Sequence, residues 1–191
     1  MKYEMFGAVV NGLQRIRAVK DFGDVKTGDI GGWIEQESNL SHDGDCWVFG
    51  HAKVFGCATV FGCAKVDGNA QVFGSAEVRG YAIVFGHAKV FGCAEVFGNA
   101  KVDGCAEVRG CARVRGNAKV YGIKRSDGHT FSYVPDEDGA MRVIAGCRYV
   151  TMEEARVHWE ETRGGTPLGD ETMSILEALT VLTKTAPNGC I

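Results

Sequence analysis

Apolar and polar positions alternate with a six-residue period through the middle of the chain. From Gly50 the sequence reads G-x-A-x-V-x twelve times without a break, ending at Tyr121. The Ala and Val of each hexad are two residues apart, so in an extended chain both side chains point to the same face. The residue between them is mostly Lys, Glu, Arg, Thr or Gln, and alternation directs it to solvent. Each hexad therefore predicts a short strand and a corner at the glycine, which readily adopts positive φ.

A six-residue strand and corner cannot bury its own apolar face, whereas stacked coils of such units can. The hexads therefore predict a mainly β protein built around a parallel β-solenoid. Two degenerate hexads extend the pattern toward the N-terminus, first Gly44–Phe49 and before it Ser38–Asp43, with Leu40 in the Ala position. We expect the repeat region to cover residues 38–122.

The G-x-A-x-V hexads resemble the hexapeptide-repeat proteins of the left-handed β-helix superfamily. That resemblance implies a triangular coil made of three hexads, about 18 residues, so that residues 50–121 form four full coils stacked about 4.8 Å apart. It also implies a left hand, whereas the general rule for parallel crossovers favours a right hand. The hand of the solenoid therefore stays open at the level of sequence. Residues 18 apart in the sequence are expected to stack in one column along the rod. An example is the inner column of Val54, Val72, Val90 and Val108.

The segments outside the repeats have a different pattern and are suited to cap a solenoid, whose end edges would otherwise recruit other strands. Residues 1–37 predict an N-terminal β cap with two short strands and a Gly-rich loop. Residues 123–191 predict a C-terminal α+β module. Its strands include a hairpin around Asp127 and the segment AMRVIAG.

Two helices are expected in the C-terminal module. The first begins at the capping box Thr151–Glu154 and runs to about Thr162. Asp170 is predicted to cap the second, whose shared apolar face consists of Ile175, Leu176, Leu179 and Leu182. The final residues, TAPNGCI, are expected to be frayed.

Two long phrases resemble a narrower group of proteins. RIRAVKDFGDVKTGDIGGWIEQESNLSHDGDCWV, followed by the repeats, is similar to uncharacterised proteins of bacteriophages and prophages. CRYVTMEEARVHWEETRGGTPLGDET is similar to a terminal module found with such repeats. Together with the hexads they cover nearly the whole chain. The resemblance implies a phage or prophage protein in the cytoplasm of a bacterial host and brings no activity with it.

Composition narrows the class further. The chain has 191 residues and a net charge of −3, which excludes a uniformly basic nucleic-acid binder. No apolar stretch approaches the roughly 18 residues of a membrane helix, and the N-terminus makes a poor signal peptide. We therefore expect no membrane partner. We also expect reduced thiols at the eight cysteines, which form no C-x-x-C motif.

An enzyme has to be considered, because the best-known hexapeptide-repeat proteins are acyltransferases. The resemblance implies a histidine on a coil face near a neighbouring subunit and an acyl donor in the groove between subunits. His51 and His87 share one position of the repeat, two coils or roughly 10 Å apart. Both replace Asn or Cys in otherwise ordinary hexads, which favours surface side chains over catalytic ones. His129 and His158 lie in the C-terminal module with no nucleophile signal nearby.

Acyltransferases of this superfamily tend to interrupt their coils with a projecting loop, and here twelve hexads run without an insertion. This argues against a substrate pocket and favours a protein with no catalytic residues and no cofactor. No metal site is expected either, because His42, His51 and His87 stand at the wrong spacings to converge on one ion. An acyltransferase that uses acetyl-CoA is the alternative.

One column of corner residues is apolar. Phe55, Phe73 and Phe91 recur once in each predicted coil and are followed in the same column by Arg109. Stacked rings at a corner form an exposed apolar stripe, and such patches mark contacts with partners. We expect this column to be the interface of a homo-oligomer, a dimer or trimer. Mutual shielding of the rings, or coverage by the C-terminal helices, are the alternatives.

A second surface feature is positive charge in residues 108–125, which contain no acid. Its basic residues are Arg109, Arg113, Arg115, Lys119, Lys124 and Arg125. On a coil these six side chains would be spread around the circumference at one height of the rod. This indicates a solvated basic belt, or a docking site for an acidic segment of a partner or of the C-terminal module. Phosphate or nucleic acid is less favoured.

These observations predict a non-enzymatic interaction protein of a phage or prophage. We expect it to use an oligomeric solenoid to bind or sequester a host protein or other host factor, including a component of host defence.

Overall fold

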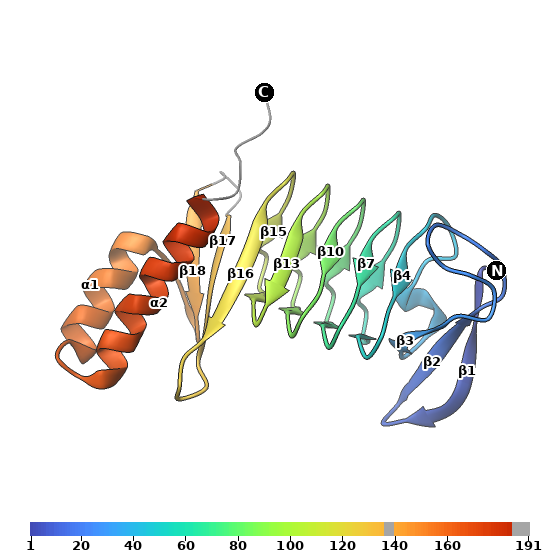
Figure 1. Ribbon diagram of the computed structural model, residues 1–191, viewed down its shortest axis with the longest axis horizontal. Coiled ribbons are helices and arrows are strands. Elements are labelled where there is room, and N and C mark those ends of the chain that lie inside the picture. The colour runs from blue at the N-terminus through green and yellow to red at the C-terminus, as the bar shows by residue number, and fades with distance from the viewer. Residues whose placement is uncertain (136–139, 185–191) are drawn as a thin grey trace.

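The computed structural model describes residues 1–135 and 140–184 and shows a rod of stacked coils (Figure 1). A β cap lies at the N-terminal end of the rod, and two helices lie beyond the opposite end. Successive partners in the coils are separated by the predicted period, as in the pairs Val54–Val72 and Val72–Val90. The mainly β solenoid and its coil of three hexads are therefore confirmed.

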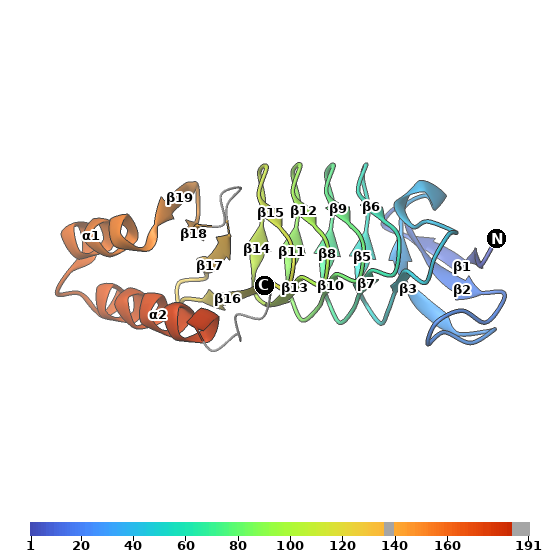
Figure 2. The same ribbon diagram turned by 90° about the horizontal axis from the view of Figure 1, so that it is seen from above.

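Three sheets form the faces of the solenoid, and each regular coil contributes one strand to each sheet, whereas the first coil meets the third sheet only through the Leu40–Val60 bridge (Figure 2). The first sheet contains, in spatial order, β1 (Tyr3–Val10), β2 (Leu13–Ala18), β3 (Ile30–Ile34), β5 (Lys53–Val54), β8 (Gln71–Val72), β11 (Lys89–Val90) and β14 (Glu107–Val108). The second contains β19 (Arg148–Thr151), β18 (Met141–Ala145), β17 (Thr130–Pro135), β16 (Lys119–Lys124), β13 (Lys101–Gly104), β10 (Ile83–Val84), β7 (Lys65–Val66) and β4 (Trp47–Val48). The third contains β15 (Arg113–Val114), β12 (Glu95–Val96), β9 (Glu77–Val78) and β6 (Thr59–Val60).

The core of the rod is a column of small side chains. The Ala and Val of the hexads are fully buried from Ala52 to Val108, and the residue between them is half-buried or exposed. Burying one Val is worth roughly 1.5 kcal/mol or more, so repetition rather than any one large residue stabilises the solenoid. The hexad glycines from Gly50 to Gly116 all have positive φ, between +56° and +76°. Both features follow from the hexad pattern.

The first coil departs from the repeat. Leu40 pairs with Val60, which places it in the Val position rather than the predicted Ala position. Ile34 likewise pairs with Val54, so the first coil is longer than the regular coils that follow it. The regular period returns at the pair Val48–Val66, after a corner with two extra residues. The prediction for Leu40 was wrong because it assumed an unbroken period through a degenerate hexad.

The N-terminal cap supplies donors to the first coil. Each coil donates its N–H groups to carbonyls of the next, as from Phe55 to Val72 at 3.0 Å. The first coil has no preceding coil, and the Lys2 ammonium instead donates to the carbonyls of Gly44 and Cys46, at 3.0 and 2.8 Å. The sheet of β1, β2 and β3 continues directly into β5, so cap and coils share one set of backbone hydrogen bonds.

The C-terminal module continues the second sheet beyond the last coil. Strands β16 to β19 run antiparallel, and the Ser132 hydroxyl of β17 accepts a hydrogen bond from the Glu107 N–H at 2.7 Å. Helix α1 (Met152–Arg163) begins at the predicted capping box, in which Thr151 Oγ1 accepts from the Glu154 N–H at 3.1 Å.

Helix α2 (Pro167–Lys184) begins earlier than predicted. Thr166 Oγ1 accepts from the Gly169 N–H at 3.1 Å and caps the helix, so Asp170 lies in its first turn. The predicted face is buried at Ile175, Leu176 and Leu179, whereas Leu182 is exposed near the helix end. Neither α1 nor α2 has the run of apolar residues needed to cross a lipid bilayer. The tail that was expected to be frayed lies outside the described residues.

Candidate functional site

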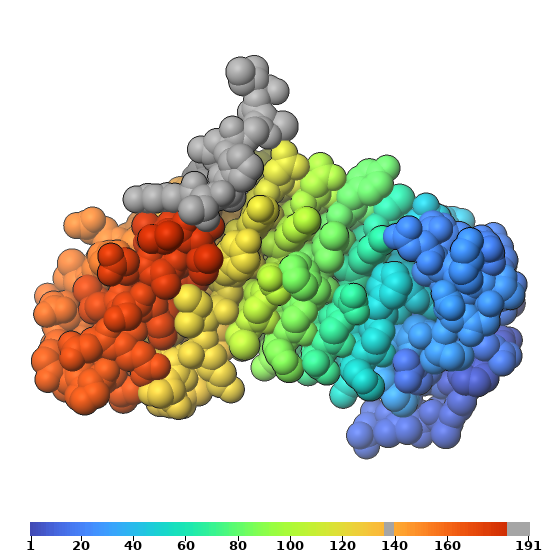
Figure 3. Space-filling model, viewed as in Figure 1, coloured from blue at the N-terminus to red at the C-terminus, as the bar shows by residue number. Residues whose placement is uncertain are grey.

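The outer surface of the coils is organised by its three corners, which we name by the residue that follows Val. Corner A, after the second sheet, carries Phe49, Asp67, Phe85, Asp103 and Tyr121. Corner B, after the first sheet, carries Phe55, Phe73, Phe91 and Arg109. Corner C, after the third sheet, carries Phe61, Arg79, Phe97 and Arg115. In the space-filling view the coils form parallel ridges between the caps (Figure 3).

Corner B is the corner with an unbroken aromatic column, which we call the Phe ladder: Phe55, Phe73 and Phe91. Its ring centroids are 5.0 and 4.9 Å apart, and the rings are parallel to within 2°. Each ring is partly exposed. The stacking expected from the period of the coils is therefore present, and the rings shield one another only on their faces.

The surroundings of the Phe ladder are small and polar. The position after each corner glycine carries Cys57, Ser75, Cys93 and Cys111, all of them exposed. The C-terminal helices lie elsewhere: α2 packs on β16 and β17, and α1 packs on β18 and β19, beyond the last coil (Figure 2). The two described helices therefore do not cover the ladder.

The six basic residues of the 108–125 segment do not gather on one face. Arg109 lies at corner B and Arg115 at corner C, while Lys119 and Lys124 belong to β16 on the second sheet. Arg113 lies on β15, where its guanidinium is 3.2 Å from the Glu95 carboxylate. That carboxylate also binds Arg79 at 3.1 Å.

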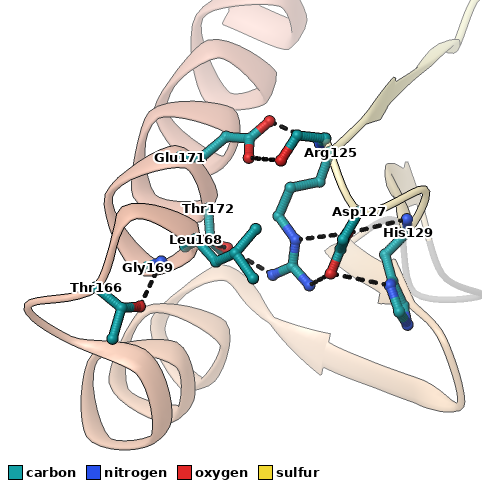
Figure 4. A network of polar contacts seen from close by, with 9 residues as sticks. Arg125, Asp127, His129, Thr166, Leu168, Gly169, Glu171 and Thr172 are labelled. Carbon is teal, nitrogen blue, oxygen red and sulfur yellow. Dashed lines mark hydrogen bonds and ion pairs between the residues drawn. The ribbon is translucent and has the colours of Figure 1, made fainter.

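The sixth basic residue, Arg125, is buried and holds the module together (Figure 4). Its Nε donates to Asp127 at 3.0 Å and its Nη1 donates to the Thr172 hydroxyl of α2 at 2.8 Å. The hydrogen bonds from Arg125 are the main reason that the pKa of Asp127 lies below its usual range. His129 Nδ1 lies 3.2 Å from the same carboxylate. Arg125 therefore ties the β16–β17 hairpin to α2.

The histidines considered for catalysis are spread over the molecule. His51 and His87 are exposed at corner A, two coils apart, and within the described residues neither ring forms a hydrogen bond. His129 and His158 both line a pocket in the C-terminal module. Over residues 1–135 and 140–184, no three His, Cys, Asp or Glu side chains converge as metal ligands would.

That pocket, which we call the C-terminal pocket, has a volume of about 380 Å³. It is lined by Arg125, His129, Phe131, Ala145, Gly146, Cys147, Arg148, His158, Trp159, Thr162 and Arg163. No sequence signal marks this pocket, because three separate elements contribute its residues and no motif links them. Two shallower hollows, of about 540 and 410 Å³, lie on the coils beside Leu40 and Phe85.

The chain is similar to a known protein over a short stretch only. No model of a protein family matches the chain. A stretch of 37 residues, 19% of the chain, is 46% identical to the uncharacterized acetyltransferase YdcK of Escherichia coli. The match spans only 11% of that protein. Together with the coils, it fits a solenoid of the hexapeptide-repeat type.

Proposed function

We propose that the protein is a non-enzymatic binding protein whose solenoids associate side by side through the Phe ladder, as a dimer or trimer. The assembly binds or sequesters a factor of the bacterial host. The observation that carries the proposal is the ladder itself, three parallel rings that are partly exposed and that the described helices leave uncovered.

The energetics favour contact over exposure. Burying a whole Phe side chain is worth about 1.5–3 kcal/mol, and contact recovers only the part of this that belongs to the exposed fraction of each ladder ring, summed over three rings. Surface ion pairs nearby contribute at most about 1 kcal/mol each. The ladder is straight because its rings repeat once per coil, so two or three rods can meet along it without changing conformation. Closed symmetry then limits the assembly to a small number of copies.

The choice of a host factor as partner follows from the resemblance of the N-terminal and C-terminal phrases to phage and prophage proteins. Under this proposal the protein occupies a host component in the bacterial cytoplasm, and counter-defence is one such role. The uninterrupted coils from Gly50 to Tyr121 support binding rather than catalysis, because no loop projects from them to form a substrate pocket.

Thiol footprinting tests the interface, because exposed Cys57 and Cys93 flank the Phe ladder. We expect these two thiols to react slowly with iodoacetamide in the native protein and faster in the Phe73→Ser/Phe91→Ser variant. Cys147, which is exposed in the C-terminal module, provides the internal control and should react at the same rate in both. Equal rates at Cys57 and Cys93 in the two proteins would contradict the proposal.

An acyltransferase is the second candidate, favoured by the acetyltransferase named in the 37-residue match. Calorimetric titration with acetyl-CoA separates the two functions. The proposed binding function predicts that the protein has no micromolar affinity for acetyl-CoA. Micromolar binding that His51→Ala or His87→Ala abolishes would contradict the proposal and favour the acyltransferase instead.

A further inference from the structure

The C-terminal pocket lies where three elements of the module meet. The β16–β17 hairpin contributes Arg125, His129 and Phe131, the turn between β18 and β19 contributes Ala145 to Arg148, and the second half of α1 contributes His158 to Arg163. Its volume of about 380 Å³ falls in the range of small-ligand sites, about 300–1,000 Å³. The pocket therefore has room for one small organic molecule.

The floor of the pocket is aromatic and rigid. Phe131 and Trp159 are almost fully buried and pack edge to face with their ring centroids 5.0 Å apart. His158 packs against Trp159 in the same manner at 5.2 Å. Because Phe131 and Trp159 are only 1% and 6% exposed, the ring that a flat ligand can contact is the partly exposed His158, which these two side chains hold in place.

The rim of the pocket is positively charged. Arg148 and Arg163 are exposed, and within the described residues neither guanidinium has a carboxylate partner. No lining residue is an Asp or Glu. The third arginine, Arg125, is already paired with Asp127. The uncompensated positive charge at the pocket therefore comes from the guanidinium groups of Arg148 and Arg163. Each guanidinium can donate two parallel hydrogen bonds, a geometry that suits phosphate oxygens.

Arg163 has a structural role, because it lies in the last turn of α1, where the helix dipole favours a cation. Arg148 comes from a different element, the edge strand β19, and lines the same pocket as Thr162 and Arg163 of that turn. A second arginine directed to the same pocket is what an anion site requires.

We propose that the C-terminal pocket binds a small organic phosphate, with the phosphate held by Arg148 and Arg163 and a flat ring resting on His158 and the exposed edge of Trp159. The site lies apart from the Phe ladder, and this inference does not depend on self-association. It assigns the C-terminal module a ligand-binding role in addition to capping the solenoid.

Calorimetric titration of the full chain with adenosine 5′-monophosphate as the probe tests the site. We expect measurable binding, weakened about tenfold or more by Arg148→Ala and by Arg163→Ala, since one charge-assisted contact is worth about a factor of ten. Arg156→Ala, on the same helix but outside the pocket, is the matched control and should bind as the native protein does. Adenosine and inorganic phosphate should each bind more weakly than the probe.

Protection of Cys147 provides a second readout that reports the location. The thiol lines the pocket, so the probe should slow its alkylation while leaving that of Cys93 unchanged. Three results would overturn the inference: no binding of the probe at millimolar concentration, equal binding by the two variants and the native protein, or equal binding of adenosine. Binding of a single-stranded oligonucleotide without the mononucleotide would assign the arginines to a polymer and also overturn it.

Discussion

Lys2 illustrates how single side chains complete the solenoid at its ends. Its ammonium is buried and is surrounded by the carbonyls of Gly44 and Cys46 and by the Cys46 sulfur, 3.2 Å away. It also lies 4.9 Å from the centre of the Phe22 ring. Nothing in the segment MKYE marks this lysine as buried, because its partners lie far along the chain and their need for donors arises from the fold.

Replacing Lys2 with Met should destabilise the protein by about 2 kcal/mol, because the buried Cys46 carbonyl and the partly buried Gly44 carbonyl lose their donor. Chemical denaturation followed by circular dichroism measures the loss. Lys20→Met, which removes an exposed lysine from the same cap, is the control and should change stability by less than about 0.5 kcal/mol. Similar losses for the two variants would show that the Lys2 contacts contribute nothing.

Asp127 gives a pH dependence with a defined sign. Because Arg125 lowers the pKa of Asp127 in the folded protein, the carboxylate stabilises the fold fully above its unfolded pKa of about 3.9. That stabilisation is lost as pH falls below this value toward the folded pKa. The gap in unfolding free energy between the native protein and Asp127→Asn should therefore narrow as pH drops from about 5 to about 2. A gap that stays constant over this range would contradict the assignment.

At the scale of secondary-structure elements, the hexad is the unit whose geometry repeats. Its glycine is the residue least tolerant of substitution. At Gly92 φ is +76°, and an added Cβ would lie 3.0 Å from the N–H nitrogen of Gly110 in the next coil. Gly110 occupies the same corner with φ +67°, but a Cβ there would meet nothing within 4 Å. The two glycines therefore share a left-handed φ that would strain any residue with a Cβ, and they differ in crowding.

Gly110→Ala should cost about 1–2 kcal/mol of stability, the price of a left-handed alanine. Gly92→Ala should cost more, because the Cβ also pushes adjacent coils apart. Thermal unfolding of the two variants measures the difference. Equal destabilisation would mean that the close approach of the corner backbones does not constrain the coils.

The hexads could be predicted from the sequence because each one repeats the same local alternation of inward and outward side chains. In one example, Ala82 and Val84 are buried and Ile83 between them is half-buried. The first coil could not be predicted, because the two extra residues between Leu40 and Val48 shift a register that is fixed only by pairing with the next coil. The Phe ladder follows from the period alone. The C-terminal pocket does not, because Phe131, Cys147 and Arg163 meet only through the packing of three elements.

At the scale of the whole molecule, the protein is a rod with a β cap at one end and a helical module at the other (Figure 1). The rod presents the Phe ladder along one corner, while the C-terminal pocket lies beyond the last coil. Separation of the two features allows an assembly held by the coils to keep its C-terminal modules accessible. The proposed binding function depends first on whether the Phe ladder joins copies of the chain.

Light scattering after size-exclusion chromatography tests that claim most directly. The native protein should have two or three times the mass of the chain, and Phe73→Ser/Phe91→Ser should have the mass of one chain while keeping the circular dichroism of the solenoid. Phe61→Ser/Phe85→Ser makes the same change at corners C and A and should leave the oligomer intact. A native protein with the mass of one chain, or an oligomer that survives the loss of the ladder, would contradict the account.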